Sequence, residues 1–365
     1  MDVVAIDGHL QARADDDAFS GVVRIERSGE VLLERGYGLA SRAWGVPCSP
    51  ELRFDTASVT KVFTAVAVLQ QVEAGAFSLD VSATGYLGLE GTTIDPAVTP
   101  YHLLTHTSGI GDDADEEDGV VYETVFADRP NYSVTETVDF LPQCAHNEPK
   151  FAPGEGTRYC NCSYVLLGLM VERASGMRYR DYVLRHVFAP AGMERSGFFR
   201  MDRIEPDVAE GADPVTDAAG AVVGWRRGIY SYPPVGSPDS GAYVTARDLI
   251  AFHHALRDGR LLSEELTAAI LRPKEDRRDL PTGSHRTGYG FEFEVDPNGE
   301  VTTYWKGGVN VGVSAILAHW PRQDLTFAVL SNRKDGAWKP IETIETALRD
   351  DLRETSGPAP EAPSD

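Results

Sequence analysis

The chain has 365 residues, of which 42% are hydrophobic, and its 56 Asp and Glu residues against 34 Lys and Arg give a formal net charge of -22. This length and composition are sufficient for one large domain or two interlocked ones. The negative charge would repel nucleic acid and anionic lipid, so neither is an expected partner.

Two features bear on location and cofactors. Residues 1–17 contain no basic segment followed by an apolar run, and no stretch has the length and apolarity of a membrane span. We therefore expect a soluble, cytoplasmic protein without a membrane partner. No metal or other cofactor is expected, because the C-x-C pair at residues 160–162 has no second Cys/His pair at zinc spacing. In the cytoplasm, the default interpretation is that all four cysteines are free, buried thiols: Cys48, Cys144, Cys160 and Cys162.

The first predicted elements are a β-hairpin and a long helix. Residues 21–40 alternate apolar and polar side chains on both sides of the turn Ser28-Gly29, which predicts the hairpin. From residue 55 to 74 apolar residues recur at helical spacing, and Gly75 stands where a helix would end. Ser58 is therefore expected at the beginning of a buried helix.

The middle of the chain alternates short helical patterns with loops rich in Gly, Pro and Asp. Helices are predicted over 164–174, where Ser175-Gly176 follows, and over 245–259, where Thr245 and Asp248 resemble a capping box. Further strands are predicted in TGYGFEFEV, VTTYW, VGVSAILAHW and LTFAVLSN. A helix over about 341–352 and a disordered tail over 356–365 follow.

This order predicts an α+β fold. The strands from both ends of the chain would form one antiparallel sheet, flanked by an N-terminal helix (residues 55–74) and by the C-terminal helix. Residues 1–80 and 241–355 would form the sheet domain, and residues 81–240 an inserted, mostly helical domain. The cleft between the two is the expected place for a site.

Ser58 and Lys61 form the first chemical motif, S-x-x-K. On a helix, residues three apart share a face, so the lysine amine can reach the serine hydroxyl and act as its base. The helix N-terminus favours a developing oxyanion. A second match, Ser331 to Lys334, follows a strand and opens no amphipathic helix, so we interpret it as a surface turn.

Two further motifs follow along the chain. Tyr159-Cys160-Asn161 is the only Y-x-N among fourteen tyrosines, and its phenol could shuttle a proton while its amide holds a lysine or a substrate carbonyl. Lys306-Gly307-Gly308 would let a substrate backbone lie along a strand edge. Each motif is weak alone: the first could be a buried aromatic with an N-cap, and the second a loop.

Taken together and in this order, the three motifs resemble the serine β-lactamase and penicillin-binding-protein superfamily, with its S-x-x-K, Y-x-N and K/H-x-G elements. The chain looks like its class C β-lactamase-like branch, which includes family VIII esterases, D-aminopeptidases and acyltransferases. The resemblance runs from about Phe19 to Leu352. It includes the phrases LLTHTSGI (103–110), FAPGEGTRYCN (151–161), YVLLG (164–168) and SGAYVTARDL (240–249).

The resemblance implies a role for each motif residue. Ser58 would be the acylated nucleophile, with Lys61 and Tyr159 sharing the acid/base work. Asn161 would position Lys61 and substrate, and Lys306 would steer a carboxylate or tune Tyr159. The backbone N–H groups of Ser58 and Val309 would form the oxyanion hole.

The chain departs from the family pattern in two places. Cys160 stands where serine is usual, and Gly307 replaces the threonine whose hydroxyl would contact a β-lactam carboxylate. Together with the expected cytoplasmic location, this argues against antibiotic defence. Among other residues, His106 is interpreted as structural, and the pair His253-His254 on the predicted helix 245–259 as surface or packing residues. No G-x-S-x-G elbow is present.

Residues 112–118 form an acidic run directly after THTSGI. This run could attract a cationic or amine-bearing substrate, but we favour the simpler interpretation of a solvated loop.

Three functions remain open. The first is a serine hydrolase acting on an ester or amide of a small molecule, with a D-amino-acid peptidase as a variant. The second is an acyltransferase that uses the same acyl-enzyme. The third is a catalytically silent binding protein. The expected partners are small-molecule acyl donors, and the sequence does not determine the oligomeric state.

Overall fold

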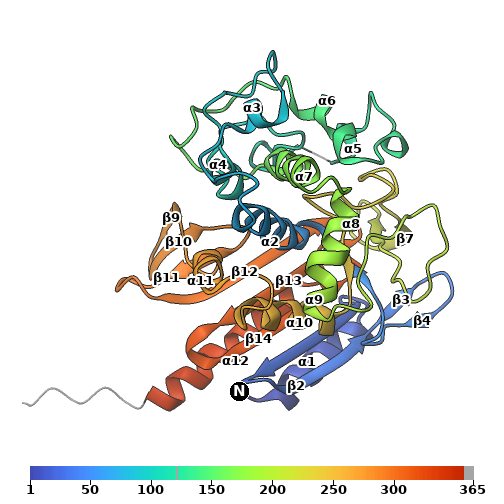
Figure 1. The fold of residues 1–365 in the computed structure, drawn as a ribbon. Coiled ribbons are helices and arrows are strands. Elements are labelled where there is room, and N and C mark those ends of the chain that lie inside the picture. Colours follow the sequence, from blue (N-terminus) through green and yellow to red (C-terminus); the bar gives the residue numbers. More distant parts are fainter. Residues whose placement is uncertain (121, 357–365) are drawn as a thin grey trace, which may run out of the picture.

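The centre of the structure is an antiparallel sheet of eight strands. The computed structural model describes residues 1–120 and 122–356. The strand order is β2-β1-β14-β13-β12-β11-β10-β9 (Figure 1). These strands are β1 (Gly21–Arg27), β2 (Glu30–Tyr37), β9 (Glu275–Leu280), β10 (Gly283–Thr287), β11 (Glu292–Val295), β12 (Val301–Asn310), β13 (Val313–Trp320) and β14 (Leu325–Ser331). The predicted α+β fold, with one antiparallel sheet built from both ends of the chain, is confirmed.

Helices cover both faces of this sheet. On one face, α1 (Val3–Asp15) and α12 (Trp338–Ser356) share a buried apolar cluster with β1, β13 and β14. On the other face, α2 (Thr60–Glu73) and α10 (Ala246–Arg257) belong to a larger cluster. The sequence did not predict α1, because only Ile6 and Leu10 of its 13 residues are buried and its apolar repeat is correspondingly weak.

Beyond α2, the segment between the paired strands β5 (Phe54–Asp55) and β8 (Tyr243–Val244) contains one long helix, α7 (Asn161–Ser175), and several short ones, separated by long loops. Its helices from α3 to α7 lie together on the far side of α2 from the sheet (Figure 1). The boundaries 81 and 240 stay a prediction, since one apolar cluster runs from the sheet through α2 to α7. The remaining elements are η1 (Ala57–Val59), α3 (Ala83–Leu87), α4 (Pro100–Leu104), η2 (Glu116–Asp118), α5 (Tyr122–Val125), η3 (Asn131–Ser133), η4 (Thr137–Phe140), α6 (Leu141–Cys144), α7 (Asn161–Ser175), α8 (Tyr179–Val183), η5 (Leu184–Phe188), α9 (Ala189–Ala191), α11 (Glu264–Ile270), η6 (Pro321–Gln323) and the small strands β3 (Leu39–Ser41), β4 (Val46–Pro47), β6 (Asp213–Thr216) and β7 (Val222–Arg226).

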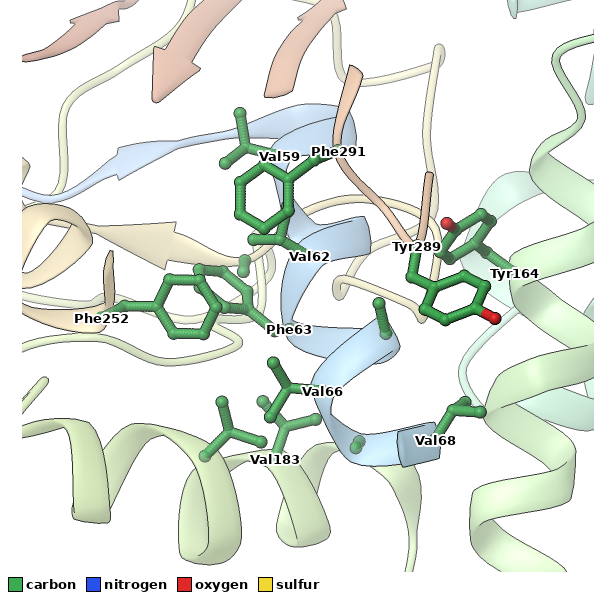
Figure 2. Packing of buried hydrophobic residues seen from close by; sticks show 14 of the residues in the cluster. Val59, Val62, Phe63, Val66, Val68, Tyr164, Val183, Phe252, Tyr289 and Phe291 are labelled. Atoms are coloured by element: carbon green, nitrogen blue, oxygen red, sulfur yellow. The ribbon is translucent and has the colours of Figure 1, made fainter. Parts of the chain in front are cut away.

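The helix α2 is buried on nearly all sides. Eleven of its 14 residues are buried, whereas the sequence indicated a single apolar face. The Phe63 ring meets the Phe252 ring edge-on at a centroid distance of 4.8 Å (Figure 2). The Phe188 ring meets Phe63 edge-on at the same distance. A helix enclosed in this way lies between the sheet and the helical segment. Any polar side chain at its N-terminal end is therefore largely withdrawn from water.

The interpretation of the cysteines was wrong for two of the four. Cys144 at the end of α6 and Cys162 in the first turn of α7 form a disulfide, with their Cα atoms 5.8 Å apart. Cys48 and Cys160 are free and buried, as predicted. The pairing was not visible in the sequence because it depends on how α6 packs against α7. Disulfides of this kind persist mainly in oxidising compartments, so the cytoplasmic location stays a prediction.

Two local predictions are corrected by tertiary contacts. The second S-x-x-K match does form a turn after β14, but Ser331, Asn332 and Arg333 are buried there, so it is not a surface turn. The Thr245 hydroxyl accepts the Asp248 N–H at 3.0 Å, as in a capping box. The Asp248 carboxylate does not return to Thr245 but accepts from Arg195 and Ser196.

The C-terminal region is described only in part. The helix α12 extends to Ser356, and the rest of the predicted disordered tail, residues 357–365, lies outside the described residues. Within residues 1–120 and 122–356, no helix combines the length and the apolarity that a membrane crossing requires.

Candidate active site

Ser58 lies in a tight turn between β5 and α2. The turn is the 3₁₀ segment η1, so α2 itself begins two residues after Ser58, at Thr60. Ala57 has a φ of 43°, an uncommon conformation for a residue with a side chain. The Asp55 carboxylate accepts the Ala57 N–H at 2.7 Å and so stabilises this conformation. Strained backbone of this kind persists where the surrounding contacts hold it, often at functional sites.

Lys61 is directed at Ser58 from the first turn of α2. Its Nζ donates to Ser58 Oγ at 3.1 Å, to Asn161 Oδ1 at 2.7 Å and to the carbonyl oxygen of Asp239 at 2.8 Å. The lysine is 0% exposed. Three acceptors match the three donors of an ammonium group, so the position of Nζ is well determined. The structure thus brings the predicted pair together in the predicted way.

Tyr159 approaches the same serine from the other side. Its hydroxyl donates to Ser58 Oγ at 2.7 Å. The Lys61 and Lys306 ammonium groups lie 4.9 and 4.8 Å from the centre of its ring. Nearby cations favour the phenolate form of a tyrosine. Ser58 Oγ is therefore in contact with two groups that could exchange protons with it.

The His106 ring packs against the ring of Tyr159. The two rings have a centroid distance of 4.6 Å, and His106 Nδ1 accepts the Cys160 N–H at 3.2 Å. Burial, together with the nearby Lys306 and Lys61, lowers the pKa of His106 well below its ordinary value. A neutral ring that accepts at Nδ1 carries its proton on Nε2. His106 therefore has the structural place that the sequence suggested.

Asn161 is held by a residue that sequence reasoning missed. The Asp112 carboxylate accepts the backbone N–H groups of Asn161 and Cys162, both at 2.9 Å, and also Asn161 Nδ2 at 3.3 Å. These are N–H groups of the first turn of α7, where a carboxylate is favourable. By fixing the amide, Asp112 orients Asn161 Oδ1 towards Lys61.

The acidic run is therefore not simply a solvated loop. Asp112 and Asp113 are half-buried, and Asp115 is buried in ion pairs with Arg158 and Lys150. The interpretation as a solvated loop fits only the exposed end of the run, which includes Asp118. The signal that could have identified Asp112 is its position two residues after the end of LLTHTSGI (103–110), one of the phrases that carried the family resemblance.

Lys306 lies on β12 and is buried, with 2% of its surface exposed. Its Nζ pairs with Glu292 Oε1 at 3.4 Å, and Glu292 also contacts His285 and Arg277. Burial raises the pKa of Glu292, but Lys306, His285 and Arg277 outweigh it and hold that pKa well below its usual range. Glu292 was not identified from the sequence, because nothing in FEFEV separates it from an ordinary strand carboxylate.

The two glycines after Lys306 allow β12 to approach Ser58. A Cβ on Gly308 would lie 2.7 Å from the backbone N of Ser58 and 2.2 Å from the carbonyl oxygen of Thr56, so no other residue fits there. Gly307 is less constrained, with the nearest such contact at 3.8 Å. The K-x-G segment is part of β12 rather than a loop, and β11 pairs with β12 only up to Trp305.

Ser58, Asn161 and Val309 line one cavity, which also includes Asp113 and Asp239. The two residues expected to supply the N–H groups of the oxyanion hole, Ser58 and Val309, thus border the same cavity. Every residue predicted for the site lies at this junction of α2, α7 and β12.

The carboxyl group of Asp55 gives the nucleophile turn a testable pH dependence. Burial raises its pKa to about 6, partly opposed by the N–H groups of Ala57 and Thr56. A folded-state pKa above the unfolded value of 3.8 means that the folded protein binds this proton more tightly. The Asp55 carboxyl group therefore contributes to the stability of the folded protein fully at pH values below the unfolded pKa of 3.8, and this contribution is lost as the pH rises through about 6.

We therefore expect Asp55→Asn to gain stability relative to wild type as pH increases. Between pH 4.5 and 7.5 the relative gain should be about 2 kcal/mol. Urea unfolding of both proteins at the two pH values measures it. A difference that does not change with pH would show that Asp55 has an ordinary pKa.

Removing the carboxylate that partners Lys306 should weaken the fold. Glu292→Gln removes the carboxylate charge that pairs with the buried Lys306 ammonium, which we expect to lower the free energy of unfolding by about 3 kcal/mol. Glu294→Gln, two residues along the same strand, is the matched control and should change it by less than about 0.5 kcal/mol. Equal effects of the two substitutions in urea unfolding would contradict the pairing.

Comparisons with known proteins give matches over most of the chain. The family model described as Beta-lactamase matches residues 6–349. Esterase EstB of Burkholderia gladioli is 31% identical over 306 residues, which are 78% of this chain and 76% of the esterase. Penicillin-binding protein 4 of Amycolatopsis lactamdurans is 27% identical over 313 residues, 82% of this chain and 77% of that protein. The crystal structure of a penicillin binding protein from Bacillus halodurans has a TM-score of 0.85 and 34% identity, and the match covers 93% of this chain and 100% of that one.

Proposed function

The chain belongs to the beta-lactamase family, and from this premise we propose that it is a serine hydrolase that forms an acyl-enzyme on Ser58 with an ester or amide of a small molecule. The observation that carries the proposal is the double contact of Ser58 Oγ, at 3.1 Å from Lys61 Nζ and 2.7 Å from the Tyr159 hydroxyl. A serine hydroxyl needs such a partner to lose its proton during attack.

The proposed reaction has two halves. In the first, one member of the Lys61–Tyr159 pair is deprotonated, either as the lysine amine or as the tyrosine phenolate. Ser58 Oγ attacks the substrate carbonyl, its proton passes to that member of the pair, and the N–H groups of Ser58 and Val309 stabilise the oxyanion. The pair then returns the proton to the leaving oxygen or nitrogen as the ester or amide bond breaks. In the second half, water loses a proton to the same pair, attacks the acyl-enzyme and releases the acid.

Lys306 has a more specific part in this proposal. Its side chain is buried, paired with Glu292 and 4.8 Å from the centre of the Tyr159 ring. This placement supports electrostatic tuning of Tyr159 rather than direct capture of a substrate carboxylate. A D-amino-acid peptidase that relies on Lys306 for carboxylate binding is correspondingly less well supported.

An acyltransferase would share the first half-reaction. In that case an alcohol or amine, rather than water, would take the acyl group from Ser58. The rate of acyl-enzyme breakdown with and without an added acceptor separates the two fates. Breakdown at the same rate in both conditions supports the hydrolase.

The direct test is the mass of the intact protein after brief exposure to p-nitrophenyl esters, penicillin and a fluorophosphonate. We expect a covalent adduct on the wild-type protein and none on Ser58→Ala. If folded wild-type protein takes no label from any of these reagents, the proposal fails and a catalytically silent binding protein becomes the better account.

A further inference from the structure

The Cys144–Cys162 disulfide lies beside two of the residues predicted for the site. It joins the last residue of α6 to the second residue of α7, and both cysteines are at most 1% exposed. Tyr159 lies three residues before Cys162, and Asn161 one residue before it. Both therefore belong to the segment of chain that the disulfide closes into a loop.

This loop has no regular secondary structure to fix its shape. Residues 145–160 contain no helix and no strand. Backbone N–H groups such as those of Gly154 and Arg158 donate to the carbonyl oxygens of Thr107 and His106, both at 2.9 Å. A loop held by scattered contacts keeps more freedom than a helix or a strand, and a covalent bond between its ends removes part of that freedom. The disulfide therefore restricts the part of the chain that carries the tyrosine of the Y-x-N motif.

The disulfide also anchors the first turn of α7, which carries Asn161. The N–H groups of Asn161 and Cys162 donate to the two oxygens of Asp112, both at 2.9 Å. The Cys162 side chain, in the same turn, is bonded to α6. Two anchors thus hold a helix end that would otherwise fray.

The position of this segment matters directly at the nucleophile. Ser58 Oγ accepts from the Tyr159 hydroxyl at 2.7 Å and from Lys61 Nζ at 3.1 Å. The same Nζ donates to Asn161 Oδ1 at 2.7 Å. A displacement of about 1 Å in a catalytic group can lower a rate by about 10²-fold. A disulfide that limits such displacement contributes to the acylation rate as well as to stability.

The other two cysteines do not take part in this cross-link. Cys48 and Cys160 are free, and both are buried. Cys160 lies two residues before Cys162, but its Sγ accepts the Ser163 N–H at 3.3 Å as the N-cap of α7. A serine at position 160 keeps an acceptor at this cap. The double variant Cys48→Ala/Cys160→Ser therefore leaves one pair of cysteines that a reductant can change.

From this placement we propose that the Cys144–Cys162 disulfide positions Tyr159 and Asn161 for acylation, so that the enzyme is fully active only when this pair is oxidised. The inference rests on the proposed function and adds its regulation by the thiol–disulfide state. Dithiothreitol supplies the two electrons and two protons that convert the disulfide to two thiols, and itself becomes a cyclic disulfide. Oxidised glutathione reverses the change and is released as two molecules of reduced glutathione.

The test compares acylation in the oxidised and the reduced protein. Because both cysteines are buried, the protein is treated with dithiothreitol in urea, refolded and desalted under argon, so that no free dithiol attacks the ester. The burst of p-nitrophenolate from p-nitrophenyl acetate then gives the acylation rate constant. We expect reduction to lower this constant by about tenfold or more, with KM changed by less than about twofold. Oxidised glutathione should restore it.

Three variants assign the effect to one pair of thiols. Cys144→Ala/Cys162→Val keeps the buried volume without the bond, so it should react as slowly as the reduced wild type and should not respond to dithiothreitol. Cys48→Ala/Cys160→Ser should respond as the wild type does. Ser331→Ala, which removes a buried hydrogen bond of β14, should keep the wild-type rate constant. This last variant separates positioning from a general loss of stability.

Hydrogen exchange provides a measurement that does not depend on the reaction. In the folded reduced protein, the amides of Asn161 and Cys162 should exchange at least about tenfold faster than in the oxidised protein, because the first turn of α7 has lost one anchor. Amides of β13 should exchange at the same rate in both states, which excludes global unfolding as the cause.

The two levels of the proposal fail in different ways. An unchanged acylation rate constant after verified reduction, a comparable loss in Ser331→Ala, or unchanged exchange at Asn161 and Cys162 would overturn the positioning role even if Ser58 is acylated. If no ester acylates Ser58, the hydrolase fails, and exchange at these two amides still decides whether the disulfide holds the first turn of α7.

Discussion

Replacing Ser58 by alanine is expected to lower kcat/KM for p-nitrophenyl acetate by at least about 10⁴-fold, because no other hydroxyl replaces the acylated atom. The change deletes one oxygen that receives hydrogen bonds from Lys61 and Tyr159. It creates no large cavity, so the fold should survive. Steady-state kinetics measures the loss, and the urea midpoint verifies that the variant is folded.

The second S-x-x-K match provides a matched control. Ser331 is buried and donates to the Ser20 carbonyl oxygen at 2.7 Å, on β14 and outside the cavity that contains Ser58. Ser331→Ala should therefore cost about 1 kcal/mol of stability and leave the esterase rate within about twofold of wild type. An active Ser58→Ala protein beside an inactive Ser331→Ala protein would reverse the assignment.

Replacing Lys61 by methionine should have the next largest effect. Methionine keeps the apolar stem but removes the Nζ that contacts Ser58, Asn161 and the Asp239 carbonyl. We expect kcat to fall by about 10³-fold, because one of the two groups that can exchange a proton with Ser58 is lost. Single-turnover kinetics should locate the loss in the acylation step.

Lys334→Met is the control for this substitution, since Lys334 holds the corresponding place in the second match and is exposed. It should leave kcat unchanged within about twofold. If Lys61→Met keeps more than a tenth of the wild-type kcat, Lys61 is not the essential proton acceptor. Tyr159→Phe, which removes only the other hydroxyl in contact with Ser58, then becomes the variant to compare.

Contacts between residues that are close in the sequence could be predicted without the structure. The three-residue spacing of Ser58 and Lys61 puts them on one side of a helical turn, and the contact at 3.1 Å agrees with this. The contact between Tyr159 and Ser58 joins residues 101 apart in the chain. It was expected only through the family resemblance, because local periodicity carries no information about such a distance.

Supporting residues were harder to predict. Asp112 and Glu292 are carboxylates in a chain with 56 acidic residues. Nothing in the local sequence of Glu292 distinguishes it from an exposed carboxylate, and only the nearby phrase THTSGI distinguishes Asp112 from the rest of its acidic run. Their roles appear only when Asn161 and Lys306, on α7 and β12, come within hydrogen-bonding distance. The Cys144–Cys162 disulfide was missed for the same reason, since it depends on the packing of α6 against α7.

By itself, the sequence predicted the first hairpin, the helices α2 and α10 and the strands towards the C-terminus from apolar periodicity, although it did not predict α1. The residues around Ser58 were expected from short motifs whose order resembles a known family. Only the tertiary structure decided which carboxylates are buried and which cysteines pair. Those properties depend on the neighbours that α2, α7 and β12 bring together, and burial and charge pairing are set by neighbours in space rather than by neighbours in the chain.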